Sequence, residues 1–476
     1  EGHVVTESMP NVLSARYASD AMNAIWGPEH KIVLERRLWL AVLRAQIELG
    51  LEVPDGVVEA YEAVVDRVDL ASIAEREAIT RHDVKARIDE FCALAGHEHI
   101  HRGMTSRDLT ENVEQLQVRA ALVLVRDRLV AVLARFGRLA EEHAGLVMVA
   151  RTHNVAAQAT TLGKRYADAA EETMIGLERV EGLLERYPLR GIKGPVGTRL
   201  DQLDLLGSAE AVDTLERRIA DHLGFARVLD SVGQIYPRSL DLDVVSALVQ
   251  AVSAPASAAT TLRLMAGHEL VTEGFREGQV GSSAMPHKMN ARSAERVGAL
   301  RTVLDGHLTM AAGLAGRQWN EGDVSCSVVR RVMLPDAFLA TDGLLQTALS
   351  VLDELGVFED MVATELRRDL PFLATTRILT AAVDAGLGRE QAHELVKEHA
   401  VAAALERRRG VDVDLFDRLA ADERLPLDRT ALDAIVATPA EFAGTAVEQV
   451  GRVADRVAAV VARHPDAAAA SAEVRV

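Results

Sequence analysis

The sequence has little of what marks several large classes of protein. Its 476 residues include two cysteines, Cys92 and Cys326, and no Cys-x-x-Cys pair, so neither a disulfide framework nor a thiolate zinc site is supported. Uninterrupted apolar runs stay short of the roughly 20 residues that cross a bilayer, and the first residues lack the apolar core of a signal peptide. A formal net charge of −18 argues against non-specific nucleic-acid binding. We therefore expect a soluble, cytoplasmic protein with neither a membrane nor a nucleic acid as partner.

The composition and the apolar spacing favour helices. Hydrophobic residues make up 49% and aromatic residues only 4% of the chain, and Ala, Leu, Val, Glu and Arg dominate, which favours helix over strand. Pro28 and Gly50 bracket a first predicted helix, as Pro at the start and Gly after the end often do. No proline occurs between Pro54 and Pro188, and apolar residues form a sustained stripe over 116–139, which predicts a long helix in a bundle.

The same apolar, helix-favouring pattern returns at 240–275, 291–317 and 327–355. The sequence shows no alternation of strands and helices typical of βαβ units and no glycine-rich phosphate loop. We therefore predict an all-α fold of three helical domains, with long helices that pack partly against other subunits. Shifts in composition place the domains at 1–104, 105–368 and 369–476, the last with a frayed Ala/Ser-rich tail.

One decapeptide stands out from this helical background. Residues 281–290 read Gly-Ser-Ser-Ala-Met-Pro-His-Lys-Met-Asn. Pro286 lacks an N–H donor and biases Met285 away from the helical region, so the segment is neither a regular helix nor a strand. Its hydroxyls, imidazole, cation and amide suit a lid that carries chemistry to a substrate, although an ordinary solvated loop would look alike in isolation.

Polar residues also interrupt the apolar pattern at four other places. The first comprises Arg81-His82-Asp83 and the stretch 97–108, where His97, His99 and His101 alternate. These histidines could indicate a metal, but no known metal-site spacing follows. Alternatively, Thr105 or Ser106 caps the long helix, whose free N–H groups favour a bound carboxylate. The other three places are Arg151-Thr152-His153-Asn154, then Gln234 with Tyr236 and Arg238, and then 318–323 with Ser325, Ser327, Arg330 and Arg331.

Together these residues suit an elimination from an anionic substrate. Removing a proton next to a carboxylate places charge on that carboxylate, which needs preorganised donors and cations such as Lys288 and the arginines. The leaving group needs an acid, for which either His153 or His101 is suited near neutral pH. A serine base would need its alkoxide stabilised. The paired Arg330 and Arg331 could bind a phosphate or carboxylate, or could form ordinary ion pairs.

The loop and the four polar stretches, in this order, resemble the fumarase/aspartase superfamily from about Pro10 to about Pro465. The superfamily motif Gly-Ser-Ser-x-Met-Pro-x-Lys-x-Asn is matched at 281–290, and His287 before the lysine resembles the adenylosuccinate lyase branch. The resemblance implies three helical domains and a homotetramer with a twenty-helix core. It also implies active sites shared between subunits, without a metal or an organic cofactor.

The reaction that the resemblance implies is release of fumarate from adenylosuccinate, giving AMP, and from SAICAR, giving AICAR. In this scheme Ser282 is the base and His153 the acid, His82 supports the acid, and Lys288 with Asn290 binds the carboxylate that develops charge. The remaining residues that the resemblance assigns to substrate binding are Arg16, Tyr17, Arg81, Asp83, His101, Thr105, Ser106, Thr152, Gln234, Ser283, Met285, Ser327 and Arg331.

Four positions depart from common patterns of that branch: Asn154, Ala291, Gly322 and the Arg199-Leu200 pair. The loss of an arginine at 322 removes a contact to a substrate carboxylate or phosphate. These departures leave two alternatives open. One is a paralogue that eliminates a different group from a succinyl compound in specialised metabolism. The other is a binding or structural protein that has lost catalysis.

Overall fold

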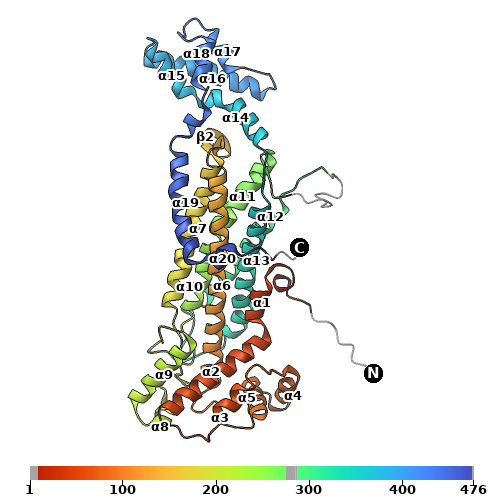
Figure 1. Ribbon diagram of the computed structural model, residues 1–476, viewed down its shortest axis with the longest axis vertical. Helices are drawn as coiled ribbons and strands as arrows, with labels where there is room; N and C mark the ends of the chain where they lie inside the picture. The colour runs from red at the N-terminus through yellow and green to blue at the C-terminus, as the bar shows by residue number, and fades with distance from the viewer. Residues whose placement is uncertain (1–8, 275–284, 286, 474–476) are drawn as a thin grey trace.

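The computed structural model describes residues 9–274, 285 and 287–473, and the description below is confined to them. The molecule is elongated: a long helical bundle separates a group of N-terminal helices at one end from a small helical cluster at the other (Figure 1). The described residues are mostly helical, as predicted from the composition of the chain.

The first helices form one end of the molecule. The helix predicted from Pro28 is confirmed, because α2 has this proline in its first turn and Gly50 follows its end with a φ of +102°. Trp39 of α2 is 1% exposed and packs on Phe91. The elements of this part are the π-helical turn η1 (Leu13–Tyr17), α1 (Asp20–Trp26), α2 (Pro28–Glu48), α3 (Val57–Glu62), α4 (Leu70–Thr80) and α5 (Asp83–Ala95).

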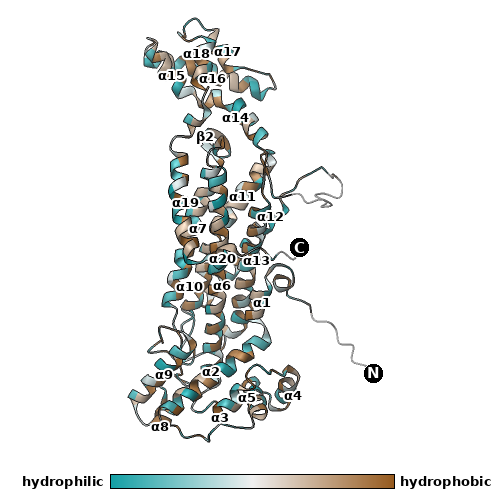
Figure 2. Ribbon diagram, in the orientation of Figure 1, coloured by the Kyte–Doolittle hydropathy of each residue, from teal (hydrophilic) through white to brown (hydrophobic). Residues whose placement is uncertain are grey.

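Long helices make the central bundle, and α6 runs through its middle for 37 residues, about 55 Å at 1.5 Å per residue. Hydrophobic residues extend along the whole bundle (Figure 2), because its inner helices are buried on several faces. Two short helices, α8 and α9, extend the end that α2 covers. The helices are α6 (Ser106–Glu142), α7 (Leu162–Arg186), α8 (Leu200–Leu206), α9 (Ala209–Leu223), α10 (Ser239–Ala251), α11 (Ser253–Gly267), α12 (Arg292–Leu314) and α13 (Cys326–Glu354).

The segment Ser239–Gly267, which comprises α10 and α11, is long and apolar enough to span a membrane by length and composition. Half of its most apolar window is buried inside the chain, however. A core helix of a bundle passes the same test, so this one segment is weak evidence for a membrane.

Two short antiparallel sheets were not predicted. The first joins β1 (Val147–Thr152) to β2 (Val155–Thr161), and the second joins β3 (Val271–Thr272) to β4 (Gly356–Val357). The sequence signal was weak because each strand is short and the hairpin side chains do not alternate cleanly between buried and exposed. The first hairpin matters for function, since it carries Thr152 and His153.

The C-terminal residues form a small cluster with a core of its own, around Ile378, Leu395 and Phe416. The boundary predicted after residue 368 falls inside α14, which continues through Pro371. The last helices then return along the bundle, where α19 packs against α6 and α7. The elements are α14 (Glu359–Leu373), α15 (Thr375–Asp384), α16 (Arg389–Arg408), α17 (Leu415–Ala420), α18 (Arg429–Ile435), the 3₁₀ turn η2 (Pro439–Ala443), α19 (Ala446–Arg463) and α20 (Pro465–Ala469).

The expectation of a frayed tail was wrong for part of its length. Residues 467–469 belong to α20, which packs on α6, and Ala468 is 8% exposed. The Arg135 guanidinium donates hydrogen bonds to the carbonyls of Ala468 and Ala470, at 2.6 and 2.8 Å. These hydrogen bonds hold residues 468–470 against α6. The Ala-rich composition of this segment gives no sign of them.

Candidate functional site

Ser282 and Ser283, the predicted base and its neighbour, lie outside the described residues. The described part of the loop places Met285, His287 and Lys288 at the surface, and the Lys288 N–H donates to the Met285 carbonyl at 3.0 Å. His287, Lys288 and Asn290 line a cleft of about 880 Å³, together with residues of α11 and α14. The loop therefore presents its imidazole, cation and amide to one cleft.

The loop is anchored where it enters α12. The Glu273 carboxylate accepts the N–H groups of Ser293 and Ala294 at 2.8 and 2.9 Å. It thereby satisfies two of the free donors in the first turn of α12, as a carboxylate at a helix N-terminus does. This contact joins the residue that directly follows β3 to the first turn of α12.

His153 occupies the tip of the β1–β2 hairpin. Thr152 pairs with Val155, and both intervening residues have left-handed backbones, with φ of +53° at His153 and +59° at Asn154. A two-residue hairpin loop with two positive φ values is a type I′ turn, in which Asn is well tolerated. Asn154 is therefore explained: it fills a position that needs Gly or Asn. The His153 side chain is exposed beyond the bundle end.

His82 and Asp83 lie at the other end of the molecule, where α4 gives way to α5. Arg81 ends α4 with a left-handed φ of +52°. His82 then caps α5, and its Nδ1 accepts the Lys85 N–H at 3.2 Å. The neighbouring Asp83 carboxylate accepts from the Arg87 guanidinium at 2.6 Å, which lowers the pKa of Asp83 against the opposing effect of burial.

His101 is held by a tryptophan. The Trp39 Nε1–H donates to His101 Nδ1 at 3.0 Å, and burial lowers the pKa of this imidazole. His101 is therefore neutral at pH 7, with Nε2 as the remaining donor. In the described ranges no group of three or more His, Cys, Asp or Glu side chains is placed to hold a metal. His97, His99 and His101 thus do not converge as ligands.

Thr105 and Ser106 begin α6, as predicted from their capping pattern. The Thr105 N–H donates to Asp108 at 2.9 Å, so Asp108 satisfies the helix start. This carboxylate is fully buried, and it also pairs with the buried Arg190 at 2.6 Å and accepts the Lys193 N–H at 2.9 Å. The first turn of α6 is therefore fixed from several sides.

The loop that carries Gln234 is tied to the same helix end. Tyr236 donates its N–H to Glu111 at 3.1 Å, and the Arg238 guanidinium forms two bonds of 2.8 Å to the Glu111 carboxylate. The Gln234 N–H donates to the Glu321 carbonyl at 2.6 Å. Sequence reasoning missed Glu111 as an anchor, because by its position it is one of several charged residues in the first turns of α6.

Gly322 packs against the Gln234 side chain. A Cβ at position 322 would lie 2.6 Å from the Gln234 Cβ and 2.9 Å from its Oε1. The absence of a side chain at this position thus leaves room for the observed Gln234 conformation.

The two arginines of α13 have different roles. Arg330 is 3% exposed and pairs with Asp241 at 2.7 Å and Glu114 at 2.6 Å, so the ion-pair interpretation holds for it. Arg331 and the half-buried Ser327 remain on the accessible side of the helix start. Tyr17 lies elsewhere: its backbone packs against Gly343 of α13, about 24 Å along the helix from Ser327, and Arg296 stacks on its ring.

The predicted site residues therefore fall into separate groups. His82, Thr105 and Gln234 lie near the start of α6, whereas His153 and Lys288 lie near its far end, about 55 Å away (Figure 1). Arg16 and Tyr17 lie between them. A single chain does not bring these groups together.

Two family models match the chain. Residues 19–303 match a model described as "Lyase", and residues 371–453 match one described as "Adenylosuccinate lyase C-terminus". The chain is 35% identical to the adenylosuccinate lyase of Saccharomyces cerevisiae over 447 residues, with 92% of each chain covered. It is 33% identical to that of Schistosoma mansoni over 451 residues, covering 93% of this chain and 94% of the relative.

Solved structures of similar fold include a fumarate lyase from Mesorhizobium sp. BNC1, with a TM-score of 0.78 and 21% identity over 92% of this chain and 98% of that one. Another is the 3-carboxy-cis,cis-muconate lactonizing enzyme of Pseudomonas putida, with a TM-score of 0.81 and 20% identity over 95% and 100% of the two chains. At these identities the likeness concerns the fold alone.

Proposed function

The chain belongs to the adenylosuccinate lyases of the fumarase/aspartase superfamily, and we propose that it eliminates fumarate from adenylosuccinate, giving AMP, and from SAICAR, giving AICAR. The substrate is a succinylated nucleotide, which several cationic and hydroxyl side chains of the predicted site are suited to hold. A paralogous lyase for a different succinyl compound is not favoured, because relatives along nearly the whole chain are adenylosuccinate lyases.

The proposed chemistry divides between the groups described above. Ser282 takes the proton from the succinyl Cβ, and His153 protonates the leaving nitrogen. Lys288 and Asn290 stabilise the carboxylate on which negative charge develops. His82 serves as a positioning residue for the acid, His153. The substrate contacts are assigned to Arg16, Tyr17, Arg81, Asp83, His101, Thr105, Ser106, Thr152, Gln234, Ser283, Met285, Ser327 and Arg331.

The observation that carries the proposal is the separation of these groups within one chain. His153 and Lys288 lie at one end of the bundle and His82 and Thr105 at the other, yet the proposed reaction needs them around one substrate. Antiparallel association of copies would place one end of a chain against the opposite end of its partner. We therefore propose a homotetramer in the cytoplasm whose active sites are shared between subunits.

Turnover of adenylosuccinate tests the activity directly. We expect the purified protein to convert adenylosuccinate and SAICAR with loss of the substrate absorbance, and Ser282→Ala to abolish turnover while substrate still binds. Ser325→Ala, which changes a hydroxyl outside the proposed base, is the matched control. A protein that neither binds nor converts either substrate would refute the proposal.

Mixing variants tests the shared site. His153→Ala and His82→Ala are each expected to lose most of the activity, whereas tetramers that contain both chains regain part of it because some sites then hold neither substitution. Mass spectrometry confirms that mixed tetramers have formed. If mixed tetramers form and regain no activity, the proposed sharing of a site between the His153 end of one chain and the His82 end of another is wrong.

A further inference from the structure

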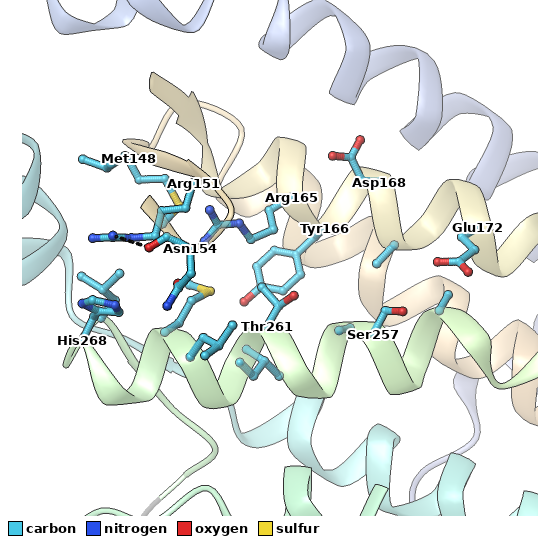
Figure 3. A pocket seen from close by; sticks show the side chains of 18 residues that line it. Met148, Arg151, Asn154, Arg165, Tyr166, Asp168, Glu172, Ser257, Thr261 and His268 are labelled. Carbon is cyan, nitrogen blue, oxygen red and sulfur yellow. Dashed lines mark hydrogen bonds between the residues drawn. The ribbon is translucent and has the colours of Figure 1, made fainter. Parts of the chain in front are cut away.

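A cavity of about 380 Å³ lies between the start of α7, the helix α11 and the β1–β2 hairpin (Figure 3). At about 30 Å³ per water molecule, it has the volume of roughly a dozen waters. Met148, Val149, Leu262 and Met265 give it an apolar wall. It contains none of the residues to which the proposed function assigns catalysis or substrate binding, although it adjoins the hairpin that carries His153.

Arg165 is a cation without a counterion at this cavity. Its side chain is partly buried, and within the described part of the chain its guanidinium makes no hydrogen bond or ion pair. Burial lowers the pKa of Arg165, and the like charge of Arg151 adds to this, whereas the Tyr166 hydroxyl and the Glu365 and Asp168 carboxylates oppose it without forming an ion pair with Arg165. A guanidinium still stays charged at neutral pH. The guanidinium is therefore available to pair with an anion that enters the cavity.

Tyr166 supplies a second unsatisfied group. Its side chain is 3% exposed, and its hydroxyl finds no hydrogen-bond partner among the residues that are described. Figure 3 shows the ring directed from α7 toward α11, where Thr261 lies. Leaving a buried hydroxyl unpaired costs about 1–3 kcal/mol. An acceptor bound beside Tyr166 would recover this cost.

The other charges near the cavity are largely compensated. Arg151 forms an ion pair with Glu365, and Asp168 forms one with Lys164. Glu172 carries a negative charge, but it is exposed and lies two turns along α7 from Arg165, about 10 Å away. The inner end of the cavity therefore has one cation without a direct ion-pair partner among the described residues and one hydroxyl donor without a hydrogen bond. This set matches a monoanion better than a phosphate dianion.

We propose that this cavity is a binding site for a small organic monocarboxylate, separate from the catalytic centre. The carboxylate accepts from Arg165 and from the Tyr166 hydroxyl, and the apolar part of the ligand packs on Met148 and Leu262. Carboxylate recognition by guanidinium and hydroxyl donors in a largely apolar pocket is the usual arrangement of a small-molecule site.

Binding of 4-fluorobenzoate to the full-length protein, followed by ¹⁹F NMR, tests the site. We expect saturable binding with one site per chain, and no binding of the neutral 4-fluorobenzamide. Tyr166→Phe removes only the hydroxyl and is expected to weaken binding about tenfold. Arg165→Met removes the charge at similar length and is expected to abolish binding.

Arg179→Met is the matched control, because it removes another cation of α7 that does not line the cavity, and its partner Asp243 does not line it either. It is expected to bind the probe like the wild type, and thermal unfolding shows that all three variants are folded. Excess AMP is expected not to displace the probe. Absence of saturable binding, equal weakening by Arg179→Met, undiminished binding by Arg165→Met, or displacement by AMP would each overturn the proposal.

Discussion

Replacing Glu35 by glutamine should remove a pH dependence of the folding stability. Glu35 of α2 is fully buried, and its carboxylate lies 3.0 Å from the Arg87 guanidinium. Neither carboxylate oxygen accepts a hydrogen bond from the described residues. Burial raises the pKa of Glu35 from an ordinary 4.5 to about 7, and the opposite effects of Arg87 and Lys31 only partly offset this.

The sign follows from proton binding. Between pH 4.5 and about 7 the folded protein keeps the Glu35 proton, whereas the unfolded chain has lost it. Stability therefore falls as the pH rises through this window. Each unit between folded and unfolded pKa values is worth about 1.36 kcal/mol. The difference between 4.5 and about 7 thus costs the folded state roughly 3 kcal/mol at pH 8.

Glutamine keeps the size of the side chain and is neutral throughout. The unfolding free energy of Glu35→Gln relative to the wild type is therefore expected to rise by roughly 3 kcal/mol between pH 5 and pH 8. Urea unfolding at several pH values and one fixed protein concentration measures this difference, since the other titrating groups are common to both proteins. The proposed association of subunits makes the fixed concentration necessary.

Glu52→Gln controls for the loss of a carboxylate, because Glu52 is exposed on the segment after α2. Its stability difference from the wild type is expected to stay constant over the same pH range. Parallel pH curves for Glu35→Gln and the wild type would refute the reasoning, because the buried carboxylate would then not titrate differently on folding.

Three further outcomes are expected. Arg238→Met removes the bidentate partner of the buried Glu111 carboxylate and should destabilise the fold by about 3–5 kcal/mol in urea unfolding. Arg424→Met removes the partner of Asp422 at the surface and should leave the unfolding midpoint unchanged. Asn154→Gly should retain full turnover, but Asn154→Val should lower kcat at least tenfold because a β-branched residue resists the left-handed turn; equal rates would contradict this. Gly322→Ala should displace the Gln234 side chain and raise KM several-fold with little change in kcat; an unchanged KM would contradict it.

The helical architecture could be read from the sequence because it rests on local rules. Pro28 and Gly50 mark the ends of α2, and the capping residues at 105–108 mark the start of α6. Both follow from backbone geometry within a few residues. The β1–β2 hairpin was missed because its strands are short, although a His-Asn pair that tolerates positive φ stands at its tip.

The chemistry of single residues was less predictable where it depends on distant partners. Arg330 and Arg331 look alike in sequence, yet only Arg330 is buried against Asp241. Likewise, Glu111 looked like a helix-start charge and instead holds the segment that carries Gln234. The Arg330–Asp241 and Arg238–Glu111 ion pairs join positions 89 and 127 residues apart, so no local pattern predicts them.

The sequence by itself determined the all-α class, the long central helices, the family and the residues proposed for catalysis, because these depend on local periodicity and on contiguous motifs. Only the tertiary structure decided how those residues are distributed in space. It places His153 and Lys288 at one end of a rod of about 55 Å and His82 and Thr105 at the other. The reason is mechanical: a rigid helix such as α6 fixes the distance between its ends, so a single chain keeps these two groups of residues apart.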